Sequence, residues 1–193
     1  MVPTDEDLLH AVRAGDGDSL GVLVDRWERP LFHFVYRLLE RRDDARDVCQ
    51  ETFLRIFRKA NRFKDGARFS TWMYQIALNL CRDHLRRRRR WGMILDETEE
   101  SRTLTPERMQ TLPGARDPSV DLEHEEQRHA LARALAEIPP EQREVLVLKE
   151  FEGLKFREIA EILGCPESTV KSRMYYGLSG LRSALARQGI RGL

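Results

Sequence analysis

The sequence has few cysteines, no long apolar run and almost no excess of charge of either sign. Its cysteines, Cys49, Cys81 and Cys165, lie far apart and form no C-x-x-C pair. We expect reduced thiols, largely in the core, and no metal site. No stretch approaches the about 20 consecutive apolar residues of a membrane helix, and the first residues are acidic rather than signal-like. We therefore expect a cytoplasmic protein without membrane insertion.

The charge is distributed unevenly along the 193 residues, although the net charge of +1 by itself indicates no partner. Residues 1–90 carry 19 basic and 14 acidic side chains, residues 91–130 carry 4 and 10, and residues 131–193 carry 10 and 8. Two mildly basic blocks therefore flank an acidic middle.

Helical periodicity dominates, and no segment alternates convincingly with the period of a strand. Thr4, with Asp7 three residues later, predicts a capped first helix that ends at Gly15. The next helices are expected over about 18–41, with Pro30 kinking or splitting the helix, over 43–60, and from an N-cap at Ser70 into the arginines at 86–90.

The periodicity fades between Trp91 and about residue 116, where acidic residues, threonines and prolines predict a linker. Asp117-Pro118 is typical of a helix start, and further helices are expected over about 140–151, 155–163 and 166–187. The predicted fold is all-α: two small helical domains, 1–90 and 118–193, joined by a flexible linker over 91–117.

The segment Phe156–Leu178 has the spacing of a helix-turn-helix. Ala160 is small where two helices cross, Gly164 can take the positive φ that ends the first helix, and Val170 packs the second helix back. The second helix presents polar residues near its N-terminal end, the end that enters the major groove in this motif. They are Glu167, Ser168, Thr169, Lys171, Ser172, Arg173 and Tyr175. An ordinary helical hairpin is the alternative, but the combination favours DNA binding.

The helix predicted over 43–60 has an apolar stripe formed by Ala45, Val48, Cys49, Thr52, Phe53, Ile56, Phe57 and Ala60. On its other side, Asp47, Gln50, Glu51 and Leu54 share one patch. Leu54 among carboxylates is either an isolated surface apolar residue, which is common, or the centre of a protein-docking patch with a polar rim.

The helix from Ser70 carries an aromatic residue at the head of a polar, increasingly basic face. That face comprises Trp72, Gln75, Asn79, Arg82, Asp83 and Arg86. Trp72 either covers the core as a capping residue or stacks on unpaired bases while arginines hold phosphates. The five consecutive arginines at 86–90 indicate phosphate contact.

The chain resembles the sigma-70 family of RNA polymerase sigma factors. Within that family it resembles the small extracytoplasmic-function group, whose members have only the two domains called region 2 and region 4. Four strings carry the resemblance, in order and across nearly the whole chain outside the linker. They are Asp44–Phe53 (DARDVCQETF), Phe69–Asn79 (FSTWMYQIALN), Leu135–Val145 (LAEIPPEQREV), and Ile159–Gly164 (IAEILG) with Ser168–Arg173 (STVKSR).

The resemblance implies core RNA polymerase, promoter DNA and an anti-sigma factor as partners, with no cofactor and no small-molecule substrate. The largest-subunit coiled coil would bind Asp47, Gln50, Glu51 and Leu54, and the polymerase flap is a further contact. The −10 element would be read and melted by Phe69, Trp72, Gln75, Asn79, Arg82 and Arg86. The −35 element would be read by Glu167, Ser168, Thr169, Lys171, Ser172, Arg173 and Tyr176.

The chain departs from the family pattern after Arg173, where further basic residues are usual but the string here is Met174–Leu178 (MYYGL). At least one expected DNA contact is removed, and Tyr176 is uncertain as an equivalent. An unusual −35 preference is therefore expected.

Two other functions compete with this interpretation. A helix-turn-helix regulator that acts without replacing sigma would explain the C-terminal segment, but would leave the Asp47 patch and the Trp72 face unused. A recombinase or nuclease would need a nucleophile or clustered metal-binding carboxylates. Carboxylates are plentiful but do not cluster with histidine, and Asp16-x-Asp18 is typical of a turn. We therefore expect a protein that is not an enzyme.

Overall fold

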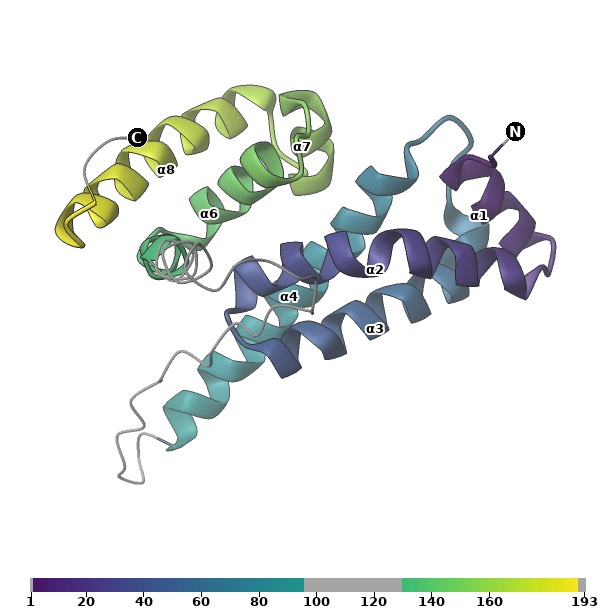
Figure 1. Cartoon of the computed structure of the whole chain (residues 1–193), viewed down its shortest axis with the longest axis horizontal. Helices are drawn as coiled ribbons and strands as arrows, with labels where there is room; N and C mark the ends of the chain where they lie inside the picture. The colour runs from purple at the N-terminus through teal and green to yellow at the C-terminus, as the bar shows by residue number, and fades with distance from the viewer. Residues whose placement is uncertain (1, 96–129, 191–193) are drawn as a thin grey trace, which may run out of the picture.

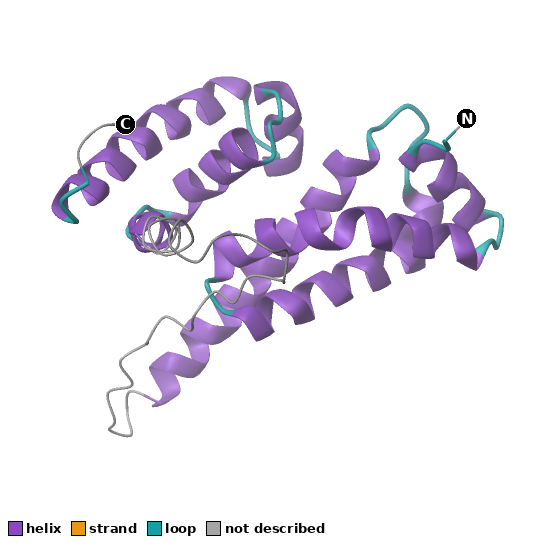
Figure 2. Cartoon of the chain, in the orientation of Figure 1, coloured by secondary structure: helices purple, strands orange, loops and turns teal. Residues whose placement is uncertain are grey.

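The computed structural model describes residues 2–95 and 130–190, with the side chains described outside 91–95. Within these ranges the chain forms helices and turns and no strand (Figure 2). The prediction of an all-α protein with two helical regions is confirmed.

The N-terminal region contains α1 (Asp5–Arg13), α2 (Gly17–Leu39), α3 (Arg42–Lys59), a short 3-10 turn η1 (Ala60–Arg62) and α4 (Phe69–Leu95). The predicted capping box is present, since the Asp7 amide donates to Thr4 Oγ1 at 3.1 Å and the Thr4 amide donates to Asp7 Oδ2 at 3.0 Å. Gly15 has the expected positive φ of 99°. However, α2 runs through Pro30 as one helix, so Pro30 does not split it.

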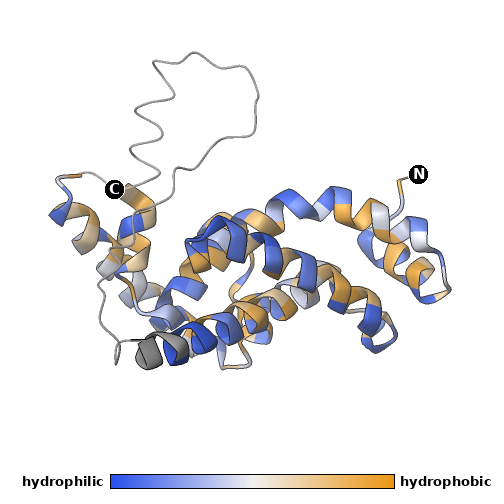
Figure 3. Cartoon of the chain, turned by 90° about the horizontal axis from the view of Figure 1, so that it is seen from below, coloured by the Kyte–Doolittle hydropathy of each residue, from blue (hydrophilic) through white to orange (hydrophobic). Residues whose placement is uncertain are grey.

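The core of this region lies where α2 packs against α1, α3 and α4. Each helix is amphipathic, and Figure 3 shows apolar and polar residues on different sides of the same helix. The fully buried side chains include Leu31, Phe34, Val35, Ala45, Ile56, Met73 and Ala77. Burial of these residues holds α3 and α4 in place, and their outer faces carry the candidate site residues.

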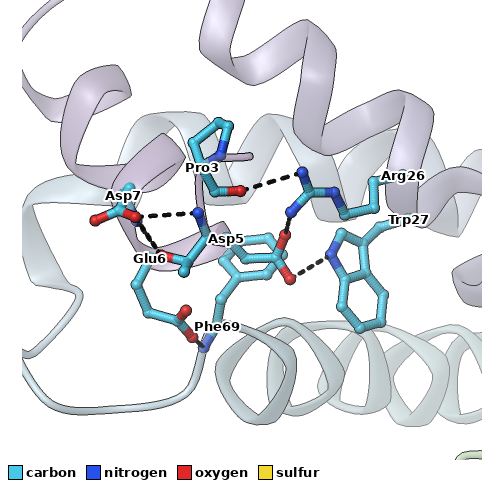
Figure 4. Close-up of polar contacts among 8 residues, drawn as sticks. Pro3, Asp5, Glu6, Asp7, Arg26, Trp27 and Phe69 are labelled. Carbon is cyan, nitrogen blue, oxygen red and sulfur yellow. Dashed lines mark hydrogen bonds and ion pairs between the residues drawn. The ribbon is translucent and has the colours of Figure 1, made fainter. Parts of the chain in front are cut away.

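The start of α4 is fixed by a carboxylate of α1 (Figure 4). The backbone N–H of Phe69 donates to Glu6 Oε1 at 2.8 Å, and a carboxylate at a helix N-terminus also complements the helix dipole. The helix begins one residue before the expected cap at Ser70. Beside it, Trp27 Nε1 donates to Asp5 Oδ2 at 3.0 Å, which further fixes the N-terminal segment on α2.

The C-terminal region contains helical residues 130–136, α6 (Pro140–Leu146), a π-helical turn η2 (Val147–Phe151), α7 (Phe156–Leu163) and α8 (Glu167–Arg187). The three predicted segments at 140–151, 155–163 and 166–187 correspond closely to these elements. The buried side chains that join them include Val145, Leu146, Leu148, Ile159, Val170 and Met174.

The two regions lie side by side, with α7 against α4 and with η2 and α6 against α2 (Figure 1). One cluster of buried residues spans both regions, and Ala134, Ala184 and Leu185 form a second, smaller cluster in the C-terminal region. Helix α4 extends to Leu95, beyond the expected boundary at 90, and the predicted helix start at Asp117-Pro118 lies outside the described residues. The exact domain limits stay a prediction.

Candidate nucleic-acid interface

Helices α7 and α8 form the helix-turn-helix that the sequence predicts. Gly164 ends α7 with φ 65° and ψ 36°, and its N–H donates to the Ala160 carbonyl. Ile159 and Val170 are fully buried and belong to the same core cluster, so the two helices are held at a fixed angle. Helix α8 begins directly after Pro166.

The outer face of α8 is open to solvent at most of the predicted −35 positions. Ser168, Lys171 and Ser172 are exposed, whereas Thr169 and Arg173 are half-buried. The polar contacts on this face are short-range: Lys171 Nζ lies 2.6 Å from Glu167 Oε1, and Ser172 Oγ donates to the Thr169 carbonyl at 3.0 Å. Arg173 turns toward the loop, with Nη1 4.0 Å from Cys165 Sγ.

The unusual string after Arg173 has two structural parts. Tyr175 and Tyr176 are 72% and 60% exposed, and their rings meet edge-on with centroids 5.5 Å apart. Gly177 is buried, and a Cβ there would lie 3.1 Å from Leu146 Cδ1. Because Gly177 has no side chain, α8 can pack closely against α6. The two tyrosines extend the exposed face of α8 by one turn.

On α4, the residues of the predicted −10 face differ in exposure. Gln75 and Asn79 are exposed, as expected for residues that contact bases. Trp72 is half-buried and its ring centroid lies 5.3 Å from that of Phe63, so it covers the core and also borders the polar face. The two interpretations of Trp72 are thus compatible in this structure.

Phe69 requires a correction, because its side chain is fully buried and cannot contact a base in this structure. Its ring packs near Trp27, with centroids 6.1 Å apart. The physical reason is the tertiary cap from Glu6, which places Phe69 at the first position of α4 with its side chain directed into the core.

Arg82 is engaged by a carboxylate of the C-terminal region. Its Nε and Nη2 donate to Glu144 Oε1 and Oε2 at 2.8 and 2.6 Å, a bidentate pair. The hydrogen bonds to Glu144 raise the pKa of Arg82 above its ordinary value. In this structure Arg82 is therefore held by α6 rather than being free for DNA.

Arg86 lies in a basic concavity at the C-terminal part of α4. It pairs with Asp83, and the concavity of about 630 Å³ is lined by Arg55, Asp83, Arg86, Arg87, Arg89 and Arg90. Arg55 comes from α3 and was not predicted as part of this face. Four arginines of the predicted phosphate-contacting run are thus joined by one from a neighbouring helix.

Helix α3 presents the predicted docking patch together with a residue that the sequence analysis placed in the core. Asp47 and Gln50 are exposed, Leu54 is 42% exposed, and Glu51 pairs with Arg55 at 2.9 Å. Phe57 is 52% exposed, so its assignment to the apolar stripe is wrong. Because positions 47, 50, 54 and 57 continue a 3-4-3 spacing, this second stripe was readable from the sequence.

Comparison with known proteins decides between the interpretations. The family model for sigma-70 region 2 matches residues 23–91, and that for sigma-70 region 4 matches residues 128–179. The chain is 32% identical over 176 residues to the ECF RNA polymerase sigma factor SigW of Bacillus subtilis, covering 90% of this chain and 92% of that protein. The chain belongs to the sigma-70 family, in its ECF group.

Other sigma factors are similar in sequence and in fold. The ECF RNA polymerase sigma factor SigE of Mycolicibacterium smegmatis is 35% identical over 192 residues, covering 96% of this chain and 70% of that protein. The solved structure of the sigma factor RpoE from Bartonella quintana, in complex with the anti-sigma factor NepR, has a TM-score of 0.66. It is 24% identical and covers 86% of this chain and 96% of that one.

As a sigma factor, the chain directs RNA polymerase in transcription initiation. In the described residues no group of three histidine, cysteine or acidic side chains is placed to hold a metal ion, and no helix there is long and apolar enough to cross a membrane. The cysteines are free thiols, with Cys49 and Cys81 buried, and burial raises the pKa of Cys49 to about 12.

Proposed function

We propose that this sigma factor binds core RNA polymerase, brings it to promoters through −10 and −35 contacts, and assists opening of the duplex. The observation that carries the proposal is the order of the two matched regions, 23–91 and 128–179, each with an exposed polar helix face. A protein with only the helix-turn-helix would have no use for the faces of α3 and α4.

The polymerase contact is assigned to the exposed stripe of α3. Leu54 and Phe57 form its apolar centre, and Asp47, Gln50 and Glu51 form its polar rim. Apolar anchors inside a polar rim are the usual arrangement of a protein interface. Family resemblance supplies the partner, the coiled coil of the polymerase largest subunit.

The −10 contact is assigned to the face of α4. The Asn79 amide offers donors and an acceptor to the edge of an unpaired base, with Gln75 one turn before it and Trp72 at its head. Stacking contributes about 1–3 kcal/mol per base, comparable to the few kcal/mol needed to extract one. Such a site traps an opened base of the non-template strand while Arg86 holds the DNA backbone, and Arg82 joins it once Glu144 releases it.

The −35 contact is assigned to the N-terminal turns of α8. In this proposal Lys171, which pairs with Glu167, contacts a phosphate. The bases are contacted by Ser168, Thr169, Ser172, Arg173 and Tyr176. Residues 96–117, which follow the end of α4, number 22 and would reach about 70 Å when fully extended. Sites one and a half duplex turns apart are separated by about 50 Å, so both elements lie within reach.

An anti-sigma factor and a cytoplasmic site of action complete the proposal. The fold-similar RpoE of Bartonella quintana is solved in complex with an anti-sigma factor. Affinity purification from non-induced cells should recover such a partner. Recovery of polymerase alone would contradict this part of the proposal.

The test of the whole proposal is transcription by purified, sigma-free core polymerase on a defined promoter with and without this protein. The expected result is a discrete transcript only when both are present. Specific binding to duplex promoter DNA without polymerase, together with no transcript, would instead indicate a helix-turn-helix regulator.

A further inference from the structure

The first turn of α1 carries three consecutive carboxylates, Asp5, Glu6 and Asp7, which point to different partners (Figure 4). Asp5 contacts side chains of α2, and Asp7 completes the capping box of α1 itself with Thr4. Glu6 reaches α4, where its Oε1 accepts from the Phe69 amide at 2.8 Å. Helix α1 precedes residue 23, where the match to the region 2 family model begins, so these contacts add to what that match explains.

The bond from Glu6 holds the first turn of α4. The first N–H groups of an α-helix have no partner within the helix and need an outside acceptor. For the Phe69 amide that acceptor is a half-buried carboxylate, and a charged acceptor sheltered from water makes a stronger bond than an exposed neutral one. Three residues into the helix, the Trp72 amide donates to the Arg68 carbonyl at 3.2 Å. Trp72 therefore stands on the turn that Glu6 holds.

A second contact from α1 supports Trp72 through the segment after η1. The Phe63 ring lies 5.3 Å from the Trp72 ring and 6.5 Å from the His10 ring, centroid to centroid. Two residues later, Asp65 Oδ1 accepts from Arg13 Nη1 at 3.2 Å and lies 3.7 Å from His10 Nε2. The Asp65 side chain is 81% exposed, so this ion pair contributes less than the half-buried bond at the start of α4.

Both contacts converge on Trp72, the aromatic residue of the base-binding face of α4 (Trp72, Gln75 and Asn79). Its ring is half-buried against Phe63 and borders Gln75 and Asn79, which are exposed. The side chains of a recognition site must be held within about 0.5 Å of their productive positions. Helix α1 supplies no side chain to this face, yet it sets the turn and the ring on which the face depends.

We propose that α1 positions the base-binding face of α4, and that Glu6 is a positioning residue for base capture that acts through Trp72. The inference rests on the proposed −10 contact and adds a requirement to it: an opened base is captured only while Glu6 holds the Phe69 amide. Binding of duplex DNA and of core polymerase is assigned to α8 and α3, so neither should depend on Glu6.

Rapid mixing of holoenzyme with promoter DNA separates the affinity of the first complex from the rate of opening. Glu6→Ala is expected to slow opening about tenfold and to lower discrimination at the captured base by a similar factor, because a hydrogen bond to a charged group is lost. The affinity of the first complex and the affinity for core polymerase should each change by less than about twofold.

Asp7→Ala is the matched control, because Asp7 is the neighbouring carboxylate and bonds to Thr4 of its own helix cap. The variant loses the capping box of α1 and should lower the thermal stability comparably to Glu6→Ala. At a temperature well below both melting points, its opening rate should stay within about twofold of the wild type. If Glu6 had a merely structural role, the two variants would slow opening equally.

Two conservative variants separate the reach of the Glu6 side chain from its charge. Glu6→Gln keeps an oxygen that can accept from the Phe69 amide, and its opening rate should fall by no more than about threefold. Glu6→Asp keeps the charge but is one methylene shorter, so it should be slowed nearly as much as Glu6→Ala. These variants also decide the question if circular dichroism shows that Glu6→Ala does not fold. Wild-type opening by Glu6→Asp would contradict the role of the bond.

Two measurements report the positioning without relying on the opening rate. Deuterium exchange of the Phe69 amide should become about tenfold faster or more in Glu6→Ala and should stay slow in Asp7→Ala. A fluorescent base analogue at the captured position of a pre-melted promoter is quenched when it stacks on an aromatic ring. Its quenching by holoenzyme should weaken in Glu6→Ala and persist in Asp7→Ala.

The route through Trp72 is tested by combining substitutions. In the Trp72→Ala background, Glu6→Ala should slow opening by less than about twofold further, because the residue that it positions is gone. A full tenfold loss in that background, or equal opening rates in Glu6→Ala and Asp7→Ala, would overturn the inference. If Trp72→Ala and Asn79→Ala both open promoters as the wild type does, the proposed −10 contact itself is wrong, whatever the result at Glu6.

Discussion

The outer faces of α4 and α8 are built from similar residues but meet different surroundings. On α8, Ser168, Lys171 and Ser172 are exposed; Lys171 pairs with Glu167 and lies 5.8 Å from the centre of the Phe156 ring of α7, and Ser172 donates to the Thr169 carbonyl. On α4, Trp72 packs against Phe63 and Arg82 is bound by Glu144 of the other domain. Helical periodicity therefore identifies the polar side of a single helix. Contacts with residues far away in the sequence decide which side chains on that side remain free to bind DNA.

The largest effect is expected from a variant that tests whether the surface for polymerase is distinct from the two DNA-binding faces. Leu54→Asp with Phe57→Asp places two charges in the apolar centre of the α3 stripe, and affinity for core polymerase should fall at least about 100-fold. Fluorescence anisotropy with labelled protein measures the affinity, and the helical circular dichroism should not change because both residues are exposed.

Tyr175→Asp with Tyr176→Asp is the matched control in the C-terminal domain, since it also removes two exposed apolar side chains. This variant should weaken transcription from promoters that depend on the −35 element, and it should change the affinity for core polymerase by less than about twofold. Equal loss of core binding in both double variants would contradict the separation of the two surfaces.

The second-largest effect is expected at the face of α4 that we propose binds an unpaired base of the −10 element. Asn79→Ala should fold and bind core normally, lose roughly 10- to 100-fold discrimination at one −10 base, and open promoters poorly. Permanganate footprinting of the promoter bubble measures the opening, and a pre-melted template should rescue transcription. Wild-type opening and base preference in this variant would refute the pocket.

Trp72→Ala distinguishes the structural role from the base contact on the same face. The contact with Phe63 predicts a loss of thermal stability for this variant, which Asn79→Ala should not show. The two variants therefore separate core covering from recognition.

Local signals predicted much of this structure. The Thr4–Asp7 box and Gly164 were readable because their hydrogen bonds and dihedral angles involve residues a few positions apart. The start of α4 was misplaced because its cap, Glu6, lies 63 residues away. Arg82 was assigned to DNA alone because its partner, Glu144, lies 62 residues further along the chain.

The candidate polymerase-binding site also combines a feature that the local sequence predicts with one that depends on tertiary packing. Positions Asp47, Gln50 and Leu54 follow helical spacing, and the sequence predicted a patch there. Phe57 was placed in the core because an aromatic side chain next to Ile56 fits the apolar stripe, although its position equally continues the 3-4-3 spacing of the patch. Ile56 is fully buried and Phe57 is exposed.

A third effect tests the close approach of α8 to α6 with two glycines in one helix. Gly177→Ala should destabilise the protein by about 1 kcal/mol, because the clash with buried Leu146 outweighs the gain in helix propensity. Gly180→Ala, whose nearest neighbour would be Ile138 Cγ1 at 3.9 Å, should instead stabilise by about 0.5–1 kcal/mol. Thermal unfolding measures both, and changes of the same sign would contradict the packing explanation.

The smallest effect tests whether α8 is as free for DNA as its exposed face indicates. If Lys171 contacts one phosphate, Lys171→Ala should lower the slope of log K against log salt concentration by about one unit, with the same loss on every −35 sequence. The affinity of holoenzyme for duplex promoter fragments should fall only a few-fold at physiological salt, because one exposed contact is lost.

Glu167 supplies the control for this last prediction, because its carboxylate lies 2.6 Å from Lys171 Nζ and competes with DNA for the ammonium group. Glu167→Gln should therefore tighten DNA binding slightly and keep the wild-type salt slope, since the phosphate contact remains. In Lys171→Ala the Glu167 carboxylate loses its ion pair and lies unpaired near the negatively charged DNA backbone. Adding Glu167→Gln to this variant removes that charge, so it should recover part of the lost DNA affinity. The lowered salt slope should remain, because the phosphate contact of Lys171 is still missing. A loss confined to one −35 base, with an unchanged salt slope, would instead mean that Lys171 contacts a base edge.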